Sequence, residues 1–193
     1  MPWVPIALKY VNMTDVNSSS VIASPVHGVG GDARPDEPAL VAMVELLFFA
    51  YRDFVAGPDE ILSELGFGRA HHRVLHFVSR NPGLRVADLL GILKITKQSL
   101  ARVLKQLVDE GYVQQETGAN DRRERRLHLT ERGKRLAARL LALQTRQLGD
   151  ALAGSGAGAR EAAAAFLAGV IAPADAEKAA ELVERALSDE VGP

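Results

Sequence analysis

The 193-residue sequence contains no cysteine, which excludes disulfide bonds, thiolate catalysis, cysteine-ligated metal sites and cysteine redox sensing. It also lacks any apolar run of the ~18–20 residues that a membrane span requires. The apolar stretch at residues 3–11 contains a proline and follows no basic segment, so it is not typical of a signal peptide. We therefore expect a cytoplasmic protein with no membrane partner.

Net charge of either sign is also nearly absent, since the formal charge is −1, but the charge is unevenly distributed. Residues 81–146 hold 14 Lys and Arg against 7 Asp and Glu, whereas the remainder holds 9 against 17. A basic module within an acidic chain is the pattern of a protein that binds a polyanion. Charge alone fits a basic, solvated surface equally well.

Residues 1–35 are rich in Ser, Gly, Pro and Asn and show no sustained hydrophobic periodicity, so we expect a flexible N-terminal extension. A helix is predicted from Asp36 to about Ala56, where Gly57-Pro58 should end it. Its apolar residues occupy more than one face, which predicts a second surface that covers it. A short turn is predicted over 59–65, and further helices over 69–80, 130–153, 159–171 and 174–187. Thr130 is expected to cap the helix over 130–153, whose candidate core positions are Leu136, Leu140, Leu143 and Leu148.

Residues 84–129, which lie between the predicted helices 69–80 and 130–153, show a distinct order of predicted elements. A short helix over 84–93 is followed by a longer helix that Thr96 caps and that extends to about Glu110. Two short extended runs, 112–117 and 124–129, then form a hairpin with Leu127 and Leu129 facing inward. A short helix, a turn, a capped helix and a hairpin are the elements of a winged helix-turn-helix.

The capped helix should bury Leu100, Val103, Leu104 and Leu107, which leaves its opposite face free for a partner. Recognition helices contact base edges mainly through their N-terminal residues. Gln can pair with adenine and Arg with guanine, while Lys and Ser can contact phosphates. The candidate DNA-binding residues of this helix are Thr96, Lys97, Gln98, Ser99, Arg102 and Lys105. An ordinary solvated helix face is the alternative.

The tip of the predicted hairpin reads Asp121-Arg122-Arg123-Glu124-Arg125-Arg126. Four arginines in five residues repel one another unless counter-charges or an anionic ligand are present. The tip therefore indicates a contact with the DNA minor groove, for which Asp121, Arg122, Arg123 and Arg125 are the candidates. A charged hairpin with no nucleic-acid role is the alternative.

At these residues the chain resembles the MarR-type winged-helix transcription regulators. The wing phrase is Asp121-x-Arg123 followed by Leu129-Thr130-x-x-Gly133, and the recognition-helix phrase runs from Ile95 to Leu100. A third phrase, Leu107-x-x-x-Gly111-Tyr112-Val113, follows it. The fuller resemblance covers about Asp36 to Ala153. The N-terminal extension and the final helix pair depart from the family pattern.

The resemblance implies a mainly α fold with a small β-hairpin wing, in which N- and C-terminal helices form a homodimer. The domains would be the extension (1–35), N-terminal dimerisation and support helices (36–80), the winged helix-turn-helix (81–130) and C-terminal dimerisation helices (131–193). The dimer would bind a pseudo-palindromic double-stranded DNA operator, with the helix from Thr96 in the major groove, Arg123 in the minor groove and Asp121 bracing the wing. A small-molecule effector would release this repressor.

Tyr51, Arg52, His72 and His76 are candidates for the effector site, although core packing explains them equally well. His72 and His76 lie four residues apart on a helix and could share a metal ion, but no cysteine or nearby acidic residue completes a set.

No catalytic set and no cofactor are predicted, so an enzyme is not expected. A winged-helix protein-docking module, a metal-responsive regulator and a small-molecule-binding protein with a vestigial DNA module remain alternatives.

Overall fold

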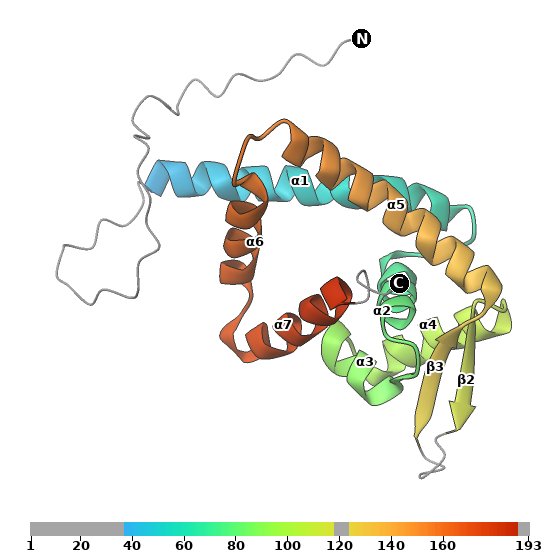
Figure 1. The fold of residues 1–193 in the computed structure, drawn as a ribbon. Helices are drawn as coiled ribbons and strands as arrows, with labels where there is room; N and C mark the ends of the chain where they lie inside the picture. The colour runs from blue at the N-terminus through green and yellow to red at the C-terminus, as the bar shows by residue number, and fades with distance from the viewer. Residues whose placement is uncertain (1–36, 118–123, 189–193) are drawn as a thin grey trace. The chain divides into compact units, whose positions relative to one another are not determined.

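The computed structural model describes residues 37–117 and 124–188. They form a mainly helical fold with a small antiparallel sheet, which confirms the predicted fold class (Figure 1). None of the helices in these ranges is long and apolar enough to cross a membrane. The elements are α1 (Glu37–Ser63), α2 (Arg69–Arg80), β1 (Leu84–Arg85), α3 (Val86–Leu93), α4 (Lys97–Asp109), β2 (Val113–Thr117), β3 (Arg125–Leu129), α5 (Glu131–Ala153), α6 (Ala159–Val170) and α7 (Pro173–Ser188).

The sheet places β3 between β1 and β2, and both pairings are antiparallel. Val113 pairs with Leu129 and Leu84 pairs with Leu127. Leu127 and Leu129 are buried, as their alternation with polar residues predicts. The sequence analysis assigned residues 84 and 85 to the short helix and missed strand β1, because a two-residue strand has no periodicity of its own.

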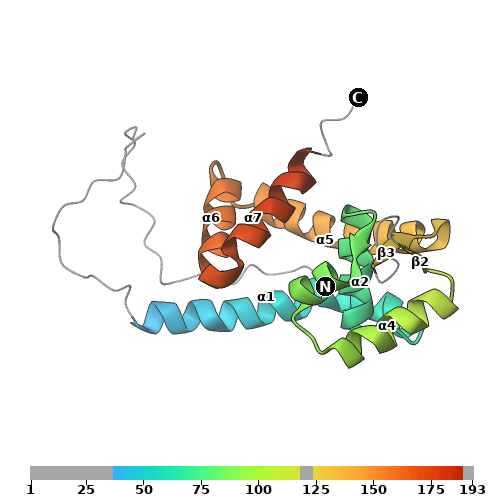
Figure 2. The same cartoon turned by 90° about the horizontal axis from the view of Figure 1, so that it is seen from below.

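The hydrophobic core lies within the winged-helix region and is centred on α2. This helix packs against α3, α4, α5 and β3, and Figures 1 and 2 both show the two long strands and α4 gathered near the first turns of α5. The fully buried side chains include Leu75 of α2, Leu107 of α4 and Leu140 of α5. Burying a leucine of this kind contributes roughly 1.5–3 kcal/mol, so this core holds α4 and the wing in one fixed arrangement.

Helix α1 continues through Gly57-Pro58 to Ser63, so the predicted helix end at Ala56 and the predicted turn at residues 59–65 are largely wrong. Proline removes one backbone hydrogen bond and crowds the preceding residue. Glycine at position 57 has no Cβ, which reduces that crowding. Val55, Pro58 and Leu62 are all buried, so packing of the last turns against the core outweighs the local preference to end the helix.

Threonine side chains start the two helices that flank the wing, as predicted. Thr96 Oγ1 accepts a hydrogen bond from the backbone N–H of Ser99 at 3.1 Å, and Thr130 Oγ1 accepts one from Gly133 at 3.1 Å. The turn between α3 and α4 passes through Lys94, which adopts a left-handed conformation with φ of 50°. This turn and the Thr96 cap set the direction in which α4 begins.

Large apolar side chains on α1 and α5 are exposed in the single chain. Leu143 and Leu148, which the sequence analysis placed in the core, are 40% and 50% exposed, so that prediction is wrong for the single chain. Leu136 and Leu140 of the same helix are buried as predicted. On α1 the exposed fractions reach 71% at Phe48. We call the exposed apolar side chains of α1 its exposed apolar face, although they extend around more than one side of the helix; they are Met43, Val44, Leu46, Leu47, Phe48, Phe49 and Tyr51.

Candidate nucleic-acid interface

Helix α4 divides cleanly into a buried and an exposed face. Leu100, Val103, Leu104 and Leu107 are between 0% and 7% exposed and anchor the helix in the core. All of the candidate DNA-binding side chains of α4 lie on the exposed part of the helix surface. These are Lys97, Gln98, Ser99, Arg102 and Lys105, preceded by the exposed N-cap Thr96.

The interactions of these side chains leave most of the N-terminal face of α4 available. Thr96 Oγ1 donates a hydrogen bond to Ser99 Oγ at 2.9 Å in addition to its capping role, so Ser99 is held at the helix start. Lys105 forms an ion pair with Asp109 one turn later, which partly neutralises its charge. The strongest positive charge on this face therefore comes from Lys97 and Arg102.

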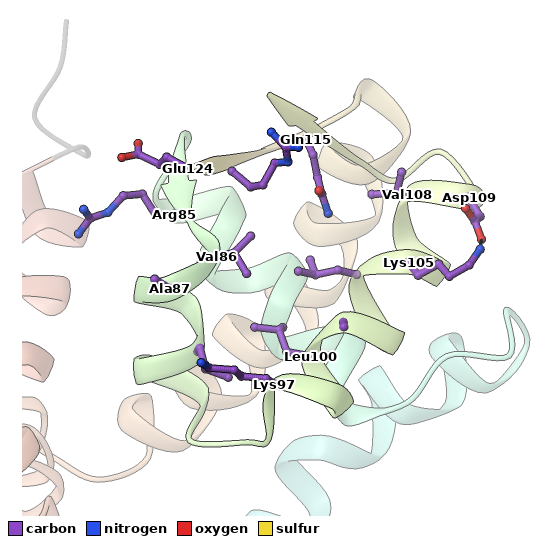
Figure 3. A pocket seen from close by; sticks show the side chains of 14 residues that line it. Arg85, Val86, Ala87, Lys97, Leu100, Lys105, Val108, Asp109, Gln115 and Glu124 are labelled. Carbon is purple, nitrogen blue, oxygen red and sulfur yellow. Dashed lines mark hydrogen bonds and ion pairs between the residues drawn. The ribbon is translucent and has the colours of Figure 1, made fainter. Parts of the chain in front are cut away.

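A groove of about 890 Å³ lies between α4, the start of α3 and the hairpin. Figure 3 shows Lys97 and Leu100 at one end of this groove and Gln115 and Glu124 at another. Its floor is apolar, whereas Lys97, Lys105 and Arg125 contribute positive charge along its walls. A hollow thus lies between the exposed side of α4 and the outer part of the hairpin, although α4 also packs against β2.

The described part of the wing is held by short polar contacts. Arg125 Nη1 donates a hydrogen bond to Thr117 Oγ1 across the hairpin at 2.9 Å, and Arg126 pairs with Glu124 at 2.7 Å. The predicted wing-tip residues Asp121, Arg122 and Arg123 lie outside the described residues.

A second candidate site is a cavity of about 430 Å³ between α1, α2 and α5. Of the predicted effector residues, Tyr51, His72 and His76 line it. Arg52 does not; it pairs with Asp53 at 2.8 Å and lies over the Phe49 ring, 5.0 Å from the ring centroid. The sequence analysis missed further lining residues, namely Phe54, Val55, Arg69, Arg73, Phe77 and Gln144.

Gln144 is the most informative of the missed residues. Its side chain is only 8% exposed, and among the described residues it has no hydrogen-bond partner. Its amide atoms are not among the fully buried, unpaired polar atoms of the described residues, so the amide reaches the cavity and is available to hydrogen-bond to a ligand or an ordered water. Two arginines of the wall already have partners: Arg69 pairs with Asp59 at 2.8 Å and Arg73 donates to the Leu93 carbonyl at 3.0 Å.

The three histidines of α2 have different roles. The N–H of Gly68 donates to His71 Nδ1 at 3.1 Å, so Nε2 carries the proton and donates to Gln106 Oε1 at 2.9 Å. His71 thus links α2 to α4. Burial lowers the pKa of His71, His72 and His76, and for His76 the positive charges of His72 and Arg80 lower it further. Among the described residues, no group of three or more His, Asp or Glu is placed to hold a metal ion.

Stability is expected to fall as the pH decreases below 6.5, the ordinary pKa of histidine. The folded protein holds His72 and His76 at a lower pKa than the unfolded chain, so below 6.5 the unfolded chain binds more protons. Above that pH both states are neutral at these groups and the effect vanishes. Urea denaturation from about pH 8 to about pH 5.5 measures how the free energy of unfolding depends on pH. His76→Gln should reduce this dependence but not abolish it, because His71 and His72 remain. An unchanged slope in the variant would contradict the assignment.

The fold and the exposed α4 face define a winged helix-turn-helix protein. Residues 65–124 match the model of the MarR family, which confirms the predicted resemblance of this region to that family.

Two curated proteins are similar to part of the chain. The HTH-type transcriptional regulator PetP of Rhodobacter capsulatus is 56% identical over 90 residues, which cover 47% of this chain and 54% of that protein. A putative transcriptional regulatory protein for the hcr operon of Thauera aromatica is 31% identical over 67 residues, which cover 35% and 40%. The chain therefore spans about half the length, or less, of the curated relatives it matches.

Solved structures share the fold at lower sequence identity. FabT of Streptococcus pneumoniae, solved in complex with DNA, superposes with a TM-score of 0.61 at 15% identity over 68% of this chain and 94% of that one. A MarR transcriptional regulator from Methanosarcina mazei gives 0.53 at 24% identity over 68% and 86%. These similarities establish the winged-helix fold.

Proposed function

We propose that this protein is a homodimeric transcriptional repressor that binds a pseudo-palindromic DNA operator and is released by a small-molecule effector. The observation that carries the proposal is that α4 has two different sides. Its apolar side is buried in the core, whereas its polar N-terminal side is exposed. A duplex major groove accepts a helix presented in this way.

In the proposed complex each side chain has a role set by its chemistry. Gln98 and Arg102 read base edges, since their amide and guanidinium groups can each make two hydrogen bonds to one base. Lys97 and Lys105 contact phosphates, together with the hydroxyl groups of Thr96 and Ser99. Arg123 enters the minor groove, with Asp121 bracing the wing. Arg122 and Arg125 contribute phosphate contacts.

Gln98→Ala is expected to lower affinity for the operator by about 1–3 kcal/mol, about 5- to 150-fold, while affinity for unrelated duplex stays nearly constant. The reason is that the lost hydrogen bonds discriminate between bases and contribute little to backbone attraction. Fluorescence anisotropy with a duplex selected from genomic fragments, and with a scrambled duplex, gives the two affinities.

Gln147→Ala is the matched control, because Gln147 is an exposed glutamine on α5, far from α4 in sequence. It should leave both affinities unchanged. If Gln98→Ala lowers the affinity for both duplexes equally, Gln98 contacts phosphates rather than bases. A wild-type protein that binds no duplex even at low salt would refute the proposed function and favour a protein-docking module.

The homodimer is supported by the exposed apolar face of α1 defined above. Seven large apolar side chains with exposed fractions from 42% to 71% form part of one helix. Monomeric soluble proteins rarely expose so continuous an apolar surface, and obligate dimers bury such faces against each other. Leu143 and Leu148 of α5 and Phe166, Leu167 and Val170 of α6 are also exposed and extend the apolar surface available for pairing.

The effector site is the cavity between α1, α2 and α5. Its size is typical of a site for a small molecule, and aromatic rings from Tyr51, Phe54 and Phe77 offer apolar contact. The amide of Gln144 supplies an unpaired donor and acceptor. The proposed dimer has two arrangements, and in one of them the recognition helices are wrongly spaced for successive major grooves. A ligand that binds this arrangement more tightly than the other lowers the operator affinity by up to the ratio of its two affinities.

A further inference from the structure

Helix α4 exposes one apolar side chain within the polar part of its surface. Apart from Ala101 and Val108, the exposed residues of this helix are all polar or charged. Val108 lies in the last turn of α4, whereas Ala101 lies in the second turn, close to the N-terminal residues assigned above to DNA. The sequence analysis did not include Ala101 among the candidates, because alanine has no group that donates or accepts a hydrogen bond.

Helical geometry places Ala101 among the side chains that are proposed to contact DNA. Residues three or four positions apart on a helix are neighbours on its surface. Ala101 therefore lies beside Gln98, which is three positions earlier, and between Lys97 and Lys105, which are four positions before and after it. It also lines the groove between α4, α3 and the hairpin, and Figure 3 shows Lys97 and Lys105 of the same lining. A side chain of one carbon thus lies among three long polar ones.

The small size of Ala101 determines how closely α4 can approach a base pair. The neighbouring glutamine and lysine side chains can reach outwards to bases or phosphates, whereas the side chain of Ala101 ends at Cβ. At this position no long side chain keeps the helix away from the DNA. The methyl group of Ala101 is therefore expected to contact the edge of a base directly when α4 enters the major groove.

The chemistry of the major groove selects the group that this methyl can contact. Base edges there carry hydrogen-bond donors, hydrogen-bond acceptors and one apolar group, the C5-methyl of thymine. A methyl placed against a donor or an acceptor removes its water without replacing the hydrogen bond, which costs free energy. A methyl placed against the thymine methyl buries two apolar groups, which is favourable.

We propose that Ala101 determines part of the sequence specificity by contacting the C5-methyl group of a thymine in the major groove. This inference rests on the proposed DNA-binding function. Gln98 and Ala101 are roughly 4.5 Å apart along the helix axis at the usual rise, and successive base pairs are about 3.4 Å apart. If α4 follows the groove, the thymine belongs to the base pair that Gln98 reads or to one within about two steps of it.

The first part of the test removes the methyl group from the DNA. The full chain is titrated, by fluorescence anisotropy, with an operator duplex selected from genomic fragments. It is also titrated with versions in which one thymine at a time, together with its counterpart in the other half-site, is replaced by deoxyuridine. Uracil keeps the base pair and lacks only the C5-methyl. One methyl contact contributes about 0.8 kcal/mol, or about fourfold in affinity, so loss in both half-sites should weaken wild-type binding about 15-fold at one position.

The second part removes the methyl group from the protein with Ala101→Gly. This variant should bind the thymine duplex more weakly than the wild type, and uracil at the same position should cause no further loss, because the contact is already absent. The ratio of the thymine and uracil affinities is taken within each protein, so the helix propensity lost at glycine cancels. Ala101 is outside the hydrophobic core, so the variant is expected to fold, which circular dichroism checks.

Two further variants are controls for this ratio. Ala138→Gly makes the same change at an exposed position of α5 and should discriminate between thymine and uracil as the wild type does. Gln98→Ala should bind the operator more weakly but keep the same ratio, since its lost hydrogen bonds do not involve the methyl group.

The outcomes separate this inference from the proposed function. A wild type that binds the operator but is indifferent to uracil at every thymine overturns the inference alone, and this comparison needs no variant. An Ala101→Gly protein that discriminates as strongly as the wild type also overturns it. A wild type that binds no duplex refutes the proposed function and the inference together.

Discussion

Gly133→Ala is expected to lower the free energy of unfolding by more than about 3 kcal/mol, although alanine is the better helix former. A Cβ on Gly133 would overlap the backbone carbonyl oxygen of Tyr112 and lie 3.0 Å from its carbonyl carbon. That oxygen cannot move aside freely, because it accepts a hydrogen bond from Thr130 N at 3.1 Å. The added methyl group therefore forces α5 away from the strand that begins the wing.

Gly149→Ala on the same helix is the matched control. No atom of the described residues lies within 4 Å of a Cβ built there, so only the helix propensity acts and stability should rise by about 0.5–1 kcal/mol. Urea denaturation of both variants gives the two changes with opposite signs. Equal stability of the two variants would show that α5 does not approach Tyr112 as described.

Phe48→Asp is expected to raise the dissociation constant of the proposed homodimer about 100-fold or more. Phe48 is 71% exposed in the single chain and lies in the exposed apolar face of α1. Loss of a buried phenylalanine costs about 3–5 kcal/mol, and a charge on the same surface adds a desolvation cost. Sedimentation velocity over a range of protein concentrations should show a monomer where the wild type is a dimer.

Ser79→Asp introduces the same charge at an exposed position of α2, away from the apolar face, and should remain dimeric. Operator affinity should fall in Phe48→Asp because a monomer contacts only one half-site. Circular dichroism separates dissociation from unfolding, since the winged-helix core does not include Phe48. A dimeric Phe48→Asp would place the subunit interface elsewhere.

The sequence predicted the fold where local and global preferences agree. The stripe of α4 and the Thr96 and Thr130 caps depend on nearby residues, and the structure shows them as predicted. Gly57-Pro58 was misread because its outcome depends on the burial of Val55 and Leu62 against distant elements. That a second surface covers the apolar side chains of α1 stays a prediction, whereas Leu143 and Leu148 were assigned to the core and are exposed in the single chain.

The candidate site could be predicted only where its residues lie close together in the sequence. The polar turn at the start of α4 is contiguous in sequence, so its residues could be named in advance. Gln144 could not be singled out, because its significance comes from burial at a cavity wall formed by three helices. The hydrogen bond from Arg185 to Asn81 is a similar case, since the two residues lie 104 positions apart and no spacing rule connects them.

Thr130 links the wing, through helix α5, to the cavity between α1, α2 and α5. Its hydroxyl donates to the Gly111 carbonyl at 2.7 Å while accepting from Gly133 N, so the turn before the wing is tied to the first turn of α5. Gln144 lies on the same helix, roughly 20 Å further along at the usual rise per residue. Because a continuous helix is stiff, we expect that a ligand that tilts α5 at Gln144 also displaces the hairpin at the other end of the helix.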